Sequence, residues 1–171
     1  MITKSSTGVA ALALFTLAAA AIAREPEGIA NGAIDMSGYL SVAAAAAAYR
    51  ESHRLSEREF LRLARTPGTI ILDARSRQKY DELHIVGAVN LSFPDIAFET
   101  LQQTIPQPTM RVLIYCNNNF VNAEKPFPSK LATASLNLST FIALYTYGYR
   151  NIWELGPQLD VEHSILPFER R

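Results

Sequence analysis

The sequence predicts an α/β domain built on a mostly parallel sheet that helices cover on both faces. Two observations support this fold class. Apolar β-rich segments alternate with helical segments along most of the chain, as in βαβ units with right-handed crossovers. The runs Thr69–Leu72 and Val112–Tyr115 do not alternate with polar residues, and continuous runs of this kind indicate strands buried on both faces. The length of 171 residues suits one such domain.

The first residues have the features of a secretory signal peptide. Lys4 supplies a positive charge, Val9–Ile22 form an apolar stretch, and Ala21-Ile22-Ala23 is a small-x-small cleavage site. The stretch is shorter than the roughly 20 residues that span a bilayer, although an uncleaved anchor is an alternative. We expect residues 1–23 to be removed, which leaves a periplasmic or secreted protein without a stable membrane span.

Residues 24–53 are interpreted as an N-terminal extension that contains an alanine-rich helix. Six consecutive alanines, Ala43–Ala48, lie within the predicted helix Tyr39–Arg50. Alanine loses no side-chain entropy in a helix, so the helix is strongly favoured, but its side chains are too small to form a core alone. We expect this helix to lie across the domain as an additional element.

The domain itself is assigned to residues 54–160, with 161–171 as a C-terminal tail. Ser56 and Glu59 have the spacing of a capping box and predict a helix start. Gly148 is placed to close the last helix. The predicted elements after the first helix are, in order, a strand at 69–72, a helix at 78–83, a strand at 87–91, a helix at 96–104, a strand at 111–115, a helix at 138–145 and a strand at 151–155.

Arginines also share one face of that first helix. They are Arg54, Arg58, Arg62 and Arg65, and glutamates lie nearby. A solvated, salt-bridged face is expected, and an anion-binding patch is the alternative.

The single cysteine, Cys116, directly follows an apolar strand and precedes a polar loop. Open α/β sheets place ligands and reactive groups at this carboxyl edge. Without a second cysteine, Cys116 forms neither an intramolecular disulfide nor a thiolate metal cage. In an oxidising compartment it is therefore a free thiol of interest, and the alternative is a buried cysteine acting as a small hydrophobe.

Three motifs give the chain a resemblance to the rhodanese homology domain over about Arg54–Leu155. The motifs are Leu72-Asp73-Ala74-Arg75 followed by Tyr80, Glu82, His84-Ile85 and Gly87-Ala88; the strand Val112–Cys116; and Gly148-Tyr149 before Ile152. The resemblance implies a mostly parallel five-stranded sheet with helices on both faces, here preceded by the alanine-rich helix.

The resemblance also implies that Cys116 is a catalytic nucleophile. In this family the cysteine thiolate attacks the outer sulfur of a donor such as thiosulfate, holds it as a persulfide and passes it to a thiophilic acceptor. The expected partners are therefore a small sulfur-containing anion and a thiol or other thiophilic acceptor, and a protein partner stays open. No cofactor is expected, and the histidine and carboxylate spacings predict no metal site.

The loop after Cys116 departs from the family pattern. Family members place a tight loop there, often with a glycine and an arginine, whereas this chain has three asparagines and then a long segment before the next helix. Asparagine tolerates left-handed backbone, so the loop is predicted either to curl around an anion with its amides inward or to be merely solvated. The predicted substrate-binding residues are Asn117, Asn118, Asn119, Phe120, Lys125 and Lys130.

A second group of residues is predicted to be structural. Asp73 and Arg75 lie at a buried strand end, where charges must be paired or hydrogen-bonded. We expect Arg75 to bridge to Glu82 or Asp81, and His84 to fix the turn into Gly87.

The sequence leaves two functions in competition. One is an exported sulfurtransferase that carries a persulfide on Cys116, and the other is a non-catalytic binding module that uses the altered loop. A phosphatase-like site is disfavoured because no arginine follows Cys116 before Arg150. Nucleic acid is not expected as a partner because the formal net charge is +0.

Overall fold

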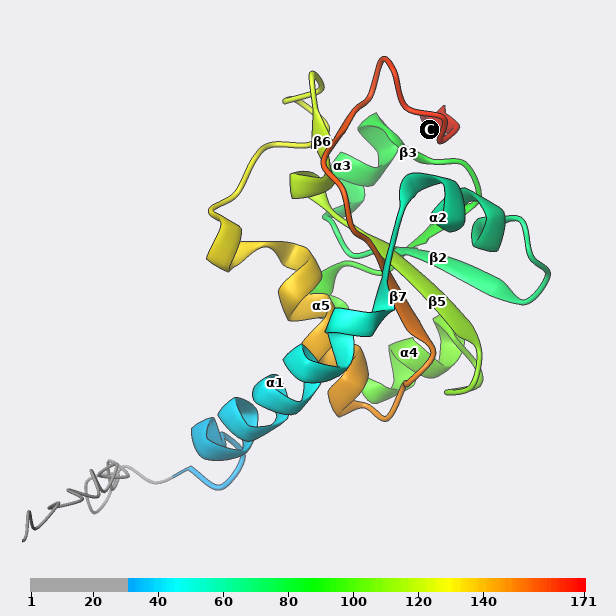
Figure 1. The fold of residues 1–171 in the computed structure, drawn as a ribbon. Coiled ribbons are helices and arrows are strands. Elements are labelled where there is room, and N and C mark those ends of the chain that lie inside the picture. The colour runs from blue at the N-terminus through cyan, green and yellow to red at the C-terminus, as the bar shows by residue number, and fades with distance from the viewer. Residues whose placement is uncertain (1–30) are drawn as a thin grey trace, which may run out of the picture. The chain divides into compact units, whose positions relative to one another are not determined.

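Five parallel strands form the central sheet of the computed structural model, which describes residues 31–171 (Figure 1). The predicted signal peptide at residues 1–23 lies outside the described residues. The sheet order is β1 (Arg54–Leu55), β7 (Ile152–Leu155), β5 (Arg111–Tyr115), β2 (Thr69–Asp73) and β4 (Ala88–Asn90). All four strand pairings are parallel, and the predicted fold class is confirmed.

Helices cover both faces of this sheet because the central strands are apolar on both sides. In β5, Leu113 and Tyr115 pack with residues of one core cluster, whereas Val112 and Ile114 pack with the other. The first cluster includes residues of α2 (Glu57–Ala64) and α3 (Arg77–Glu82). The second includes residues of α1 (Met36–Arg50), α4 (Phe98–Thr104) and α5 (Leu136–Thr146). Figure 1 shows the same division of helices around the strands.

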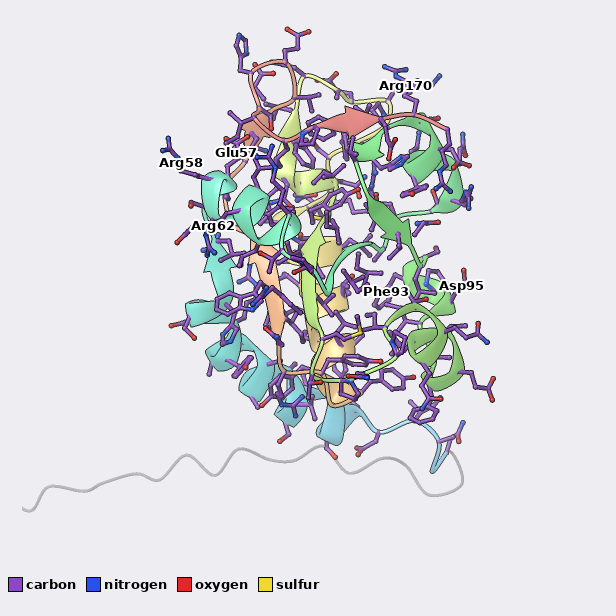
Figure 2. All side chains as sticks on the ribbon, turned by 90° about the vertical axis from the view of Figure 1, so that its right-hand side faces the viewer. Glu57, Arg58, Arg62, Phe93, Asp95 and Arg170 are labelled. Carbon is purple, nitrogen blue, oxygen red and sulfur yellow. The ribbon has the colours of Figure 1, made fainter. Side chains whose placement is uncertain are left out.

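The helix boundaries follow the signals in the sequence. The Ser56 side chain accepts from the amide of Glu59, and the Glu59 carboxylate accepts from the amide of Ser56, so the predicted capping box opens α2. Gly148 follows α5 with φ +90°, a backbone conformation that favours glycine. The arginines on the outer side of α2 are exposed, and Figure 2 shows Arg58 and Arg62 pointing away from the domain.

Helix α1 begins three residues before the predicted start and packs on the domain. Ala46 is fully buried in the second core cluster. The ring centroids of Tyr49 and Tyr145 lie 5.5 Å apart, and the Tyr49 hydroxyl donates to the Arg150 carbonyl. The small alanine side chains allow this helix to approach α5 closely, which places its last residue, Arg50, beside the carboxyl edge of the sheet.

Two small strand pairs complete the fold. Strand β3 (His84–Ile85) pairs antiparallel with β9 (Phe168–Glu169), and β6 (Phe120–Val121) pairs parallel with β8 (Leu159–Asp160). The C-terminal segment therefore returns to the domain and buries Leu166. The short 3₁₀ helices are η1 (Glu51–His53), η2 (Phe93–Asp95), η3 (Asn117–Asn119) and η4 (Ala132–Ala134). Within residues 31–171, no helix is both long and apolar enough to cross a membrane.

Candidate functional site

Cys116 lies immediately beyond β5, at the carboxyl edge of the sheet. Its neighbour Tyr115 is in register with Asp73 at the end of β2, and on the other side β5 pairs with β7. Cys116 is the N-cap of η3 and is only 1% exposed. The thiol thus occupies the position expected from the sequence, but it is covered.

A cavity of about 290 Å³ adjoins the thiol. The Cys116 Sγ atom lies 3.4 Å from the Ser135 hydroxyl, within hydrogen-bond distance. The residues that line the cavity are Arg50, Cys116, Asn118, Asn119, Ala132, Ser135, Asn137, Leu138, Glu154 and Gly156.

The three asparagines form one 3₁₀ turn, so the left-handed curl, one of the two predicted alternatives, does not form. The other alternative, a solvated loop, does not describe Asn117 and Asn119, which are buried. The only non-glycine residue with positive φ in the described chain is Asn122. The amides of Asn119 and Phe120 donate to the carbonyls of Cys116 and Asn117, so these two amides do not face an anion. An asparagine can close this turn because its side chain serves as a second backbone-like partner.

Asn119 fastens the turn to the sheet. Its Oδ1 atom accepts from the Cys116 amide at 2.9 Å, and its Nδ2 atom donates to the carbonyls of Leu155 and Pro157. The same Oδ1 atom also accepts from Asn137 Nδ2 at 3.0 Å. Asn119 therefore positions Cys116 against the end of β7, and it lines the cavity as well.

The segment after β6 folds back over the site. Phe127 is 1% exposed, and its ring centroid lies 4.5 Å from that of Phe120. Asn118 and Lys130 exchange two hydrogen bonds, since Asn118 Nδ2 donates to the Lys130 carbonyl and the Lys130 amide donates to Asn118 Oδ1. Phe120 thus belongs to the core, and the structure does not place it at the cavity beside Cys116.

The remaining predicted binding residues do not line the Cys116 cavity. Asn117 and Lys130, together with Lys79, line a second cavity of about 330 Å³ that does not include Cys116. Lys125 lines neither cavity, and its carbonyl accepts a hydrogen bond from Lys79 Nζ. Only Asn118 and Asn119 of the predicted set share a cavity with the thiol.

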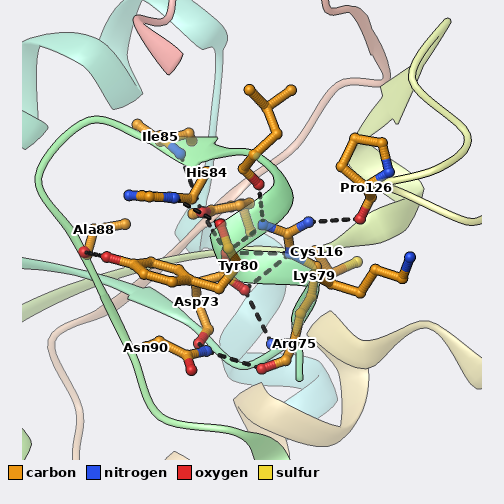
Figure 3. A network of polar contacts seen from close by, with 12 residues as sticks. Asp73, Arg75, Lys79, Tyr80, His84, Ile85, Ala88, Asn90, Cys116 and Pro126 are labelled. Atoms are coloured by element: carbon orange, nitrogen blue, oxygen red, sulfur yellow. Dashed lines mark hydrogen bonds and ion pairs between the residues drawn. The ribbon is translucent and has the colours of Figure 1, made fainter. Parts of the chain in front are cut away.

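Asp73 and Arg75 form a buried ion pair that anchors three segments (Figure 3). The guanidinium donates to both carboxylate oxygens of Asp73, to the Leu83 carbonyl and to the Pro126 carbonyl. The prediction that Arg75 bridges to Glu82 or Asp81 is wrong. The carboxylate of Asp73, two residues before Arg75, binds the guanidinium instead. Glu82 pairs with Lys79 and Asp81 with Arg77 instead.

Aromatic and polar side chains surround this pair. The Tyr115 hydroxyl donates to Asp73 Oδ2 at 2.5 Å, and burial, followed by the negative charge of Asp73, raises the pKa of Tyr115 well above its ordinary value. His84 is fully buried, stacks on Tyr80 and has its Nδ1 atom 2.7 Å from the Tyr80 carbonyl. Its Nε2 atom lies 3.4 Å from Glu169, without hydrogen-bond geometry.

Two charged residues of the cavity were missed from the sequence. The Arg50 guanidinium donates through Nε and Nη2 to the two carboxylate oxygens of Glu154, which is 3% exposed. This hydrogen-bonded carboxylate raises the pKa of Arg50, and the nearby Cys116 adds to the effect. A signal was present, because Glu154 interrupts the apolar strand Ile152–Leu155, where a buried charge requires a partner.

No cluster of three or more histidine, cysteine or carboxylate side chains that would hold a metal ion occurs within the described part of the chain. The chemistry available beside the thiol therefore consists of one hydroxyl, the carboxamides and the Arg50–Glu154 pair.

Comparison with family profiles adds to the description of this fold. The profile of the rhodanese-like domain matches residues 56–155, which is more than half of the chain. The chain belongs to the rhodanese-like domain family. Comparison with curated protein sequences gives no match.

Solved structures resemble this rhodanese-like domain at low sequence identity. A rhodanese-like domain from an Anabaena protein superposes with a TM-score of 0.50 and 18% identity, over 70% of this chain and 80% of that one. A rhodanese from E. coli gives a TM-score of 0.41 and 18% identity, and the match covers 60% of this chain and 99% of that one. A thiosulfate sulfurtransferase from Pseudomonas aeruginosa gives a TM-score of 0.42 and 21% identity, and the match covers 68% of this chain and 20% of that one.

Helix α1 lies outside the matched segment 56–155, yet its last residue lines the Cys116 cavity. This rhodanese-like domain therefore includes a wall of its site that the family profile does not cover.

Proposed function

We propose that this protein is an exported sulfurtransferase that carries sulfane sulfur as a persulfide on Cys116. The observation that carries the proposal is the placement of the only cysteine of a rhodanese-like domain at the carboxyl edge of β5, beside a cavity. The signal-like sequence of residues 1–23 supports export to a periplasmic or extracellular space.

The proposed reaction has two balanced steps. The Cys116 thiolate attacks the outer sulfur of a donor such as thiosulfate, an Sγ–S bond forms, and sulfite leaves with the electron pair of the broken S–S bond. A thiolate or other thiophilic acceptor then attacks the outer sulfur of the persulfide and releases Cys116 as thiolate. Neither step requires an external oxidant or reductant.

Residues around the thiol have roles that their chemistry suggests. The Ser135 hydroxyl, 3.4 Å from Sγ, is placed to donate a hydrogen bond to a thiolate or persulfide. Arg50 neutralises the buried Glu154 carboxylate, which would otherwise oppose negative charge on the sulfur.

A binding module is the second candidate, and the burial of Cys116 favours it. With 1% of the residue exposed, a donor reaches the sulfur only through the cavity or after movement of the covering segment. In this alternative the Cys116 side chain packs as a small hydrophobe and takes up no sulfur.

Intact-mass analysis after exposure to thiosulfate, 3-mercaptopyruvate or an inorganic polysulfide distinguishes the two candidates. We expect one added sulfur atom, removed by dithiothreitol and absent from the matched variant Cys116→Ser. A wild-type protein that gains no sulfur from any of these donors, while remaining folded, would contradict the sulfurtransferase and favour the binding module.

A further inference from the structure

The cavity beside Cys116 is lined by Arg50, whose ion pair with Glu154 engages only part of the guanidinium. An arginine carries five N–H donors in a planar fork. Glu154 engages the Nε and Nη2 groups of Arg50, and the guanidinium has no other hydrogen-bond partner among the described residues. The Arg50 side chain is 24% exposed and lines the cavity, and Glu154 does not engage its Nη1 group.

A second group in the same cavity lacks a partner. Asn137 is 4% exposed, and its Oδ1 atom is buried without a hydrogen bond to any residue of the described range 31–171. The bonding around Asn119 fixes this orientation: Asn119 Nδ2 donates to two carbonyls, so its Oδ1 accepts and Asn137 must offer Nδ2. The carboxamide oxygen of Asn137 is therefore an acceptor that needs a donor, because an unmade buried hydrogen bond costs free energy.

These two groups and the thiol define a ligand. The cavity of about 290 Å³ is near the lower end of small-molecule sites and suits a small molecule. Arg50 favours a carboxylate or similar anion, Asn137 favours an N–H or O–H donor, and Cys116 favours sulfur. Ionised thiosulfate provides the anion and sulfur but has no donor for Asn137.

We propose that the Cys116 cavity binds a small organic thiol or persulfide of the amino-acid type, with its carboxylate on Arg50 and its N–H donor on Asn137. This rests on the proposed function of Cys116, because it names the class of molecule that delivers or accepts the sulfur. Arg50 and Asn137 are binding residues in this scheme.

Formation of a mixed disulfide with Cys116 tests whether the cavity recognises amino-acid-type thiols, and it does not require sulfur transfer. In this reaction the Cys116 thiolate attacks a symmetrical disulfide, one new S–S bond forms, and one equivalent of small thiolate leaves. The probes are cystine, which carries carboxylates and ammonium groups, 3,3′-dithiodipropionate, which carries only carboxylates, and cystamine, which carries only ammonium groups. Each rate is divided by the rate for the same protein unfolded in denaturant, which removes the intrinsic reactivity of the probe.

For the wild-type protein we expect the corrected rates to fall in the order cystine, dithiodipropionate, cystamine, with steps of about threefold or more, the effect of one hydrogen bond or ion pair. Equal corrected rates for the three probes would overturn the proposal, whether or not the protein takes up a persulfide. A persulfide without this order would retain the sulfurtransferase and reject the ligand class.

Two variants with matched controls assign the preference to its residues. Asn137→Leu should remove the advantage of cystine over dithiodipropionate. Thr140→Val deletes the other unpartnered polar atom of α5, which lies outside the cavity, and should keep that advantage. Glu154→Gln should raise the preference for dithiodipropionate over cystamine, because Arg50 then lacks its neutralising charge, whereas the exposed Glu99→Gln should not. If either variant behaves like its control, the corresponding contact is not made.

Discussion

The Arg75 side chain joins three segments of the chain. Its guanidinium contacts Asp73 at the end of β2, the Leu83 carbonyl after α3, and the Pro126 carbonyl of the covering segment. It also lies 4.1 Å from the centroid of the Phe127 ring. Since both charged groups are almost fully buried, removing one leaves the other uncompensated.

Arg75→Ala should therefore destabilise the domain strongly. Loss of one partner of a buried pair costs about 3–5 kcal/mol, which for a domain of this size lowers the Tm by an amount on the order of 10 °C. Thermal unfolding followed by circular dichroism measures the shift. The control is Arg77→Ala, which breaks an exposed ion pair and should leave the Tm nearly unchanged; equal Tm values for both variants would show that Arg75 is not structural.

Single residues were predictable where the reason for their position was local. Cys116 follows a strand that its own apolar run defines, and Asp73 and Arg75 belong to a recognisable strand end. The sequence indicates that Glu154 needs a partner but not that the partner is Arg50, because the two residues are separated by 104 positions and meet only after α1 packs against the domain. The partner of Arg75 was misassigned because spacing along the chain does not show that the Asp73 side chain turns back toward it.

At the scale of elements, the segment between β6 and α5 borders the thiol, because its residues Ala132 and Ser135 line the Cys116 cavity, and we expect it to limit access to the sulfur. Phe127, in the middle of this segment, packs into the core. Two hydrogen bonds between Asn118 and Lys130 hold the second half of the segment on η3. These latter bonds are exposed to solvent, so they hold the segment more weakly than the buried contacts do.

Asn118→Ala should consequently open the site without unfolding it. We expect iodoacetamide to alkylate Cys116 several-fold faster, because loss of two exposed hydrogen bonds of about 1 kcal/mol each raises the population of the open segment. The alkylation rate is measured by mass spectrometry at constant pH. Lys125→Ala is the control, since the hydrogen bond described for Lys125 uses its backbone carbonyl, which the substitution keeps. If both variants react at the wild-type rate, the segment does not limit access.

The longer elements were predictable because each has a repeating signal, and the short ones were not. Strand β5 has the predicted bounds, 111–115, and the predicted strands at 69–72 and 151–155 differ from β2 and β7 by one residue. Strands β1, β3, β6, β8 and β9 have two residues each, which is too few for any period to be recognised. The 3₁₀ turn of η3 was missed because asparagine suits several kinds of turn, and the bonds of Asn119 to the end of β7 select among them.

At the scale of the whole molecule, the candidate site combines distant parts of the chain. Arg50 comes from α1, Cys116 from the end of β5, Asn137 from α5 and Glu154 from β7. The parallel sheet makes this possible, because the carboxyl ends of its strands meet at one edge. The extension before the family-matched region therefore belongs to the site's architecture, although its composition indicated only a helix.

The proposed export is the whole-molecule prediction that bears most on the chemistry, since a lone thiol in an oxidising compartment would have no internal disulfide partner. When the full chain is expressed in a bacterium with a periplasm, we expect the periplasmic fraction to contain a protein that begins at Arg24, as judged by intact mass and N-terminal sequencing. Signal peptidases require small residues at the cleavage site, so Ala23→Phe should block processing. Ala19→Phe, which keeps the stretch apolar and spares Ala21 and Ala23, should be processed normally. Periplasmic material that retains Met1, or equal processing of both variants, would show that residues 1–23 are not a cleaved signal peptide.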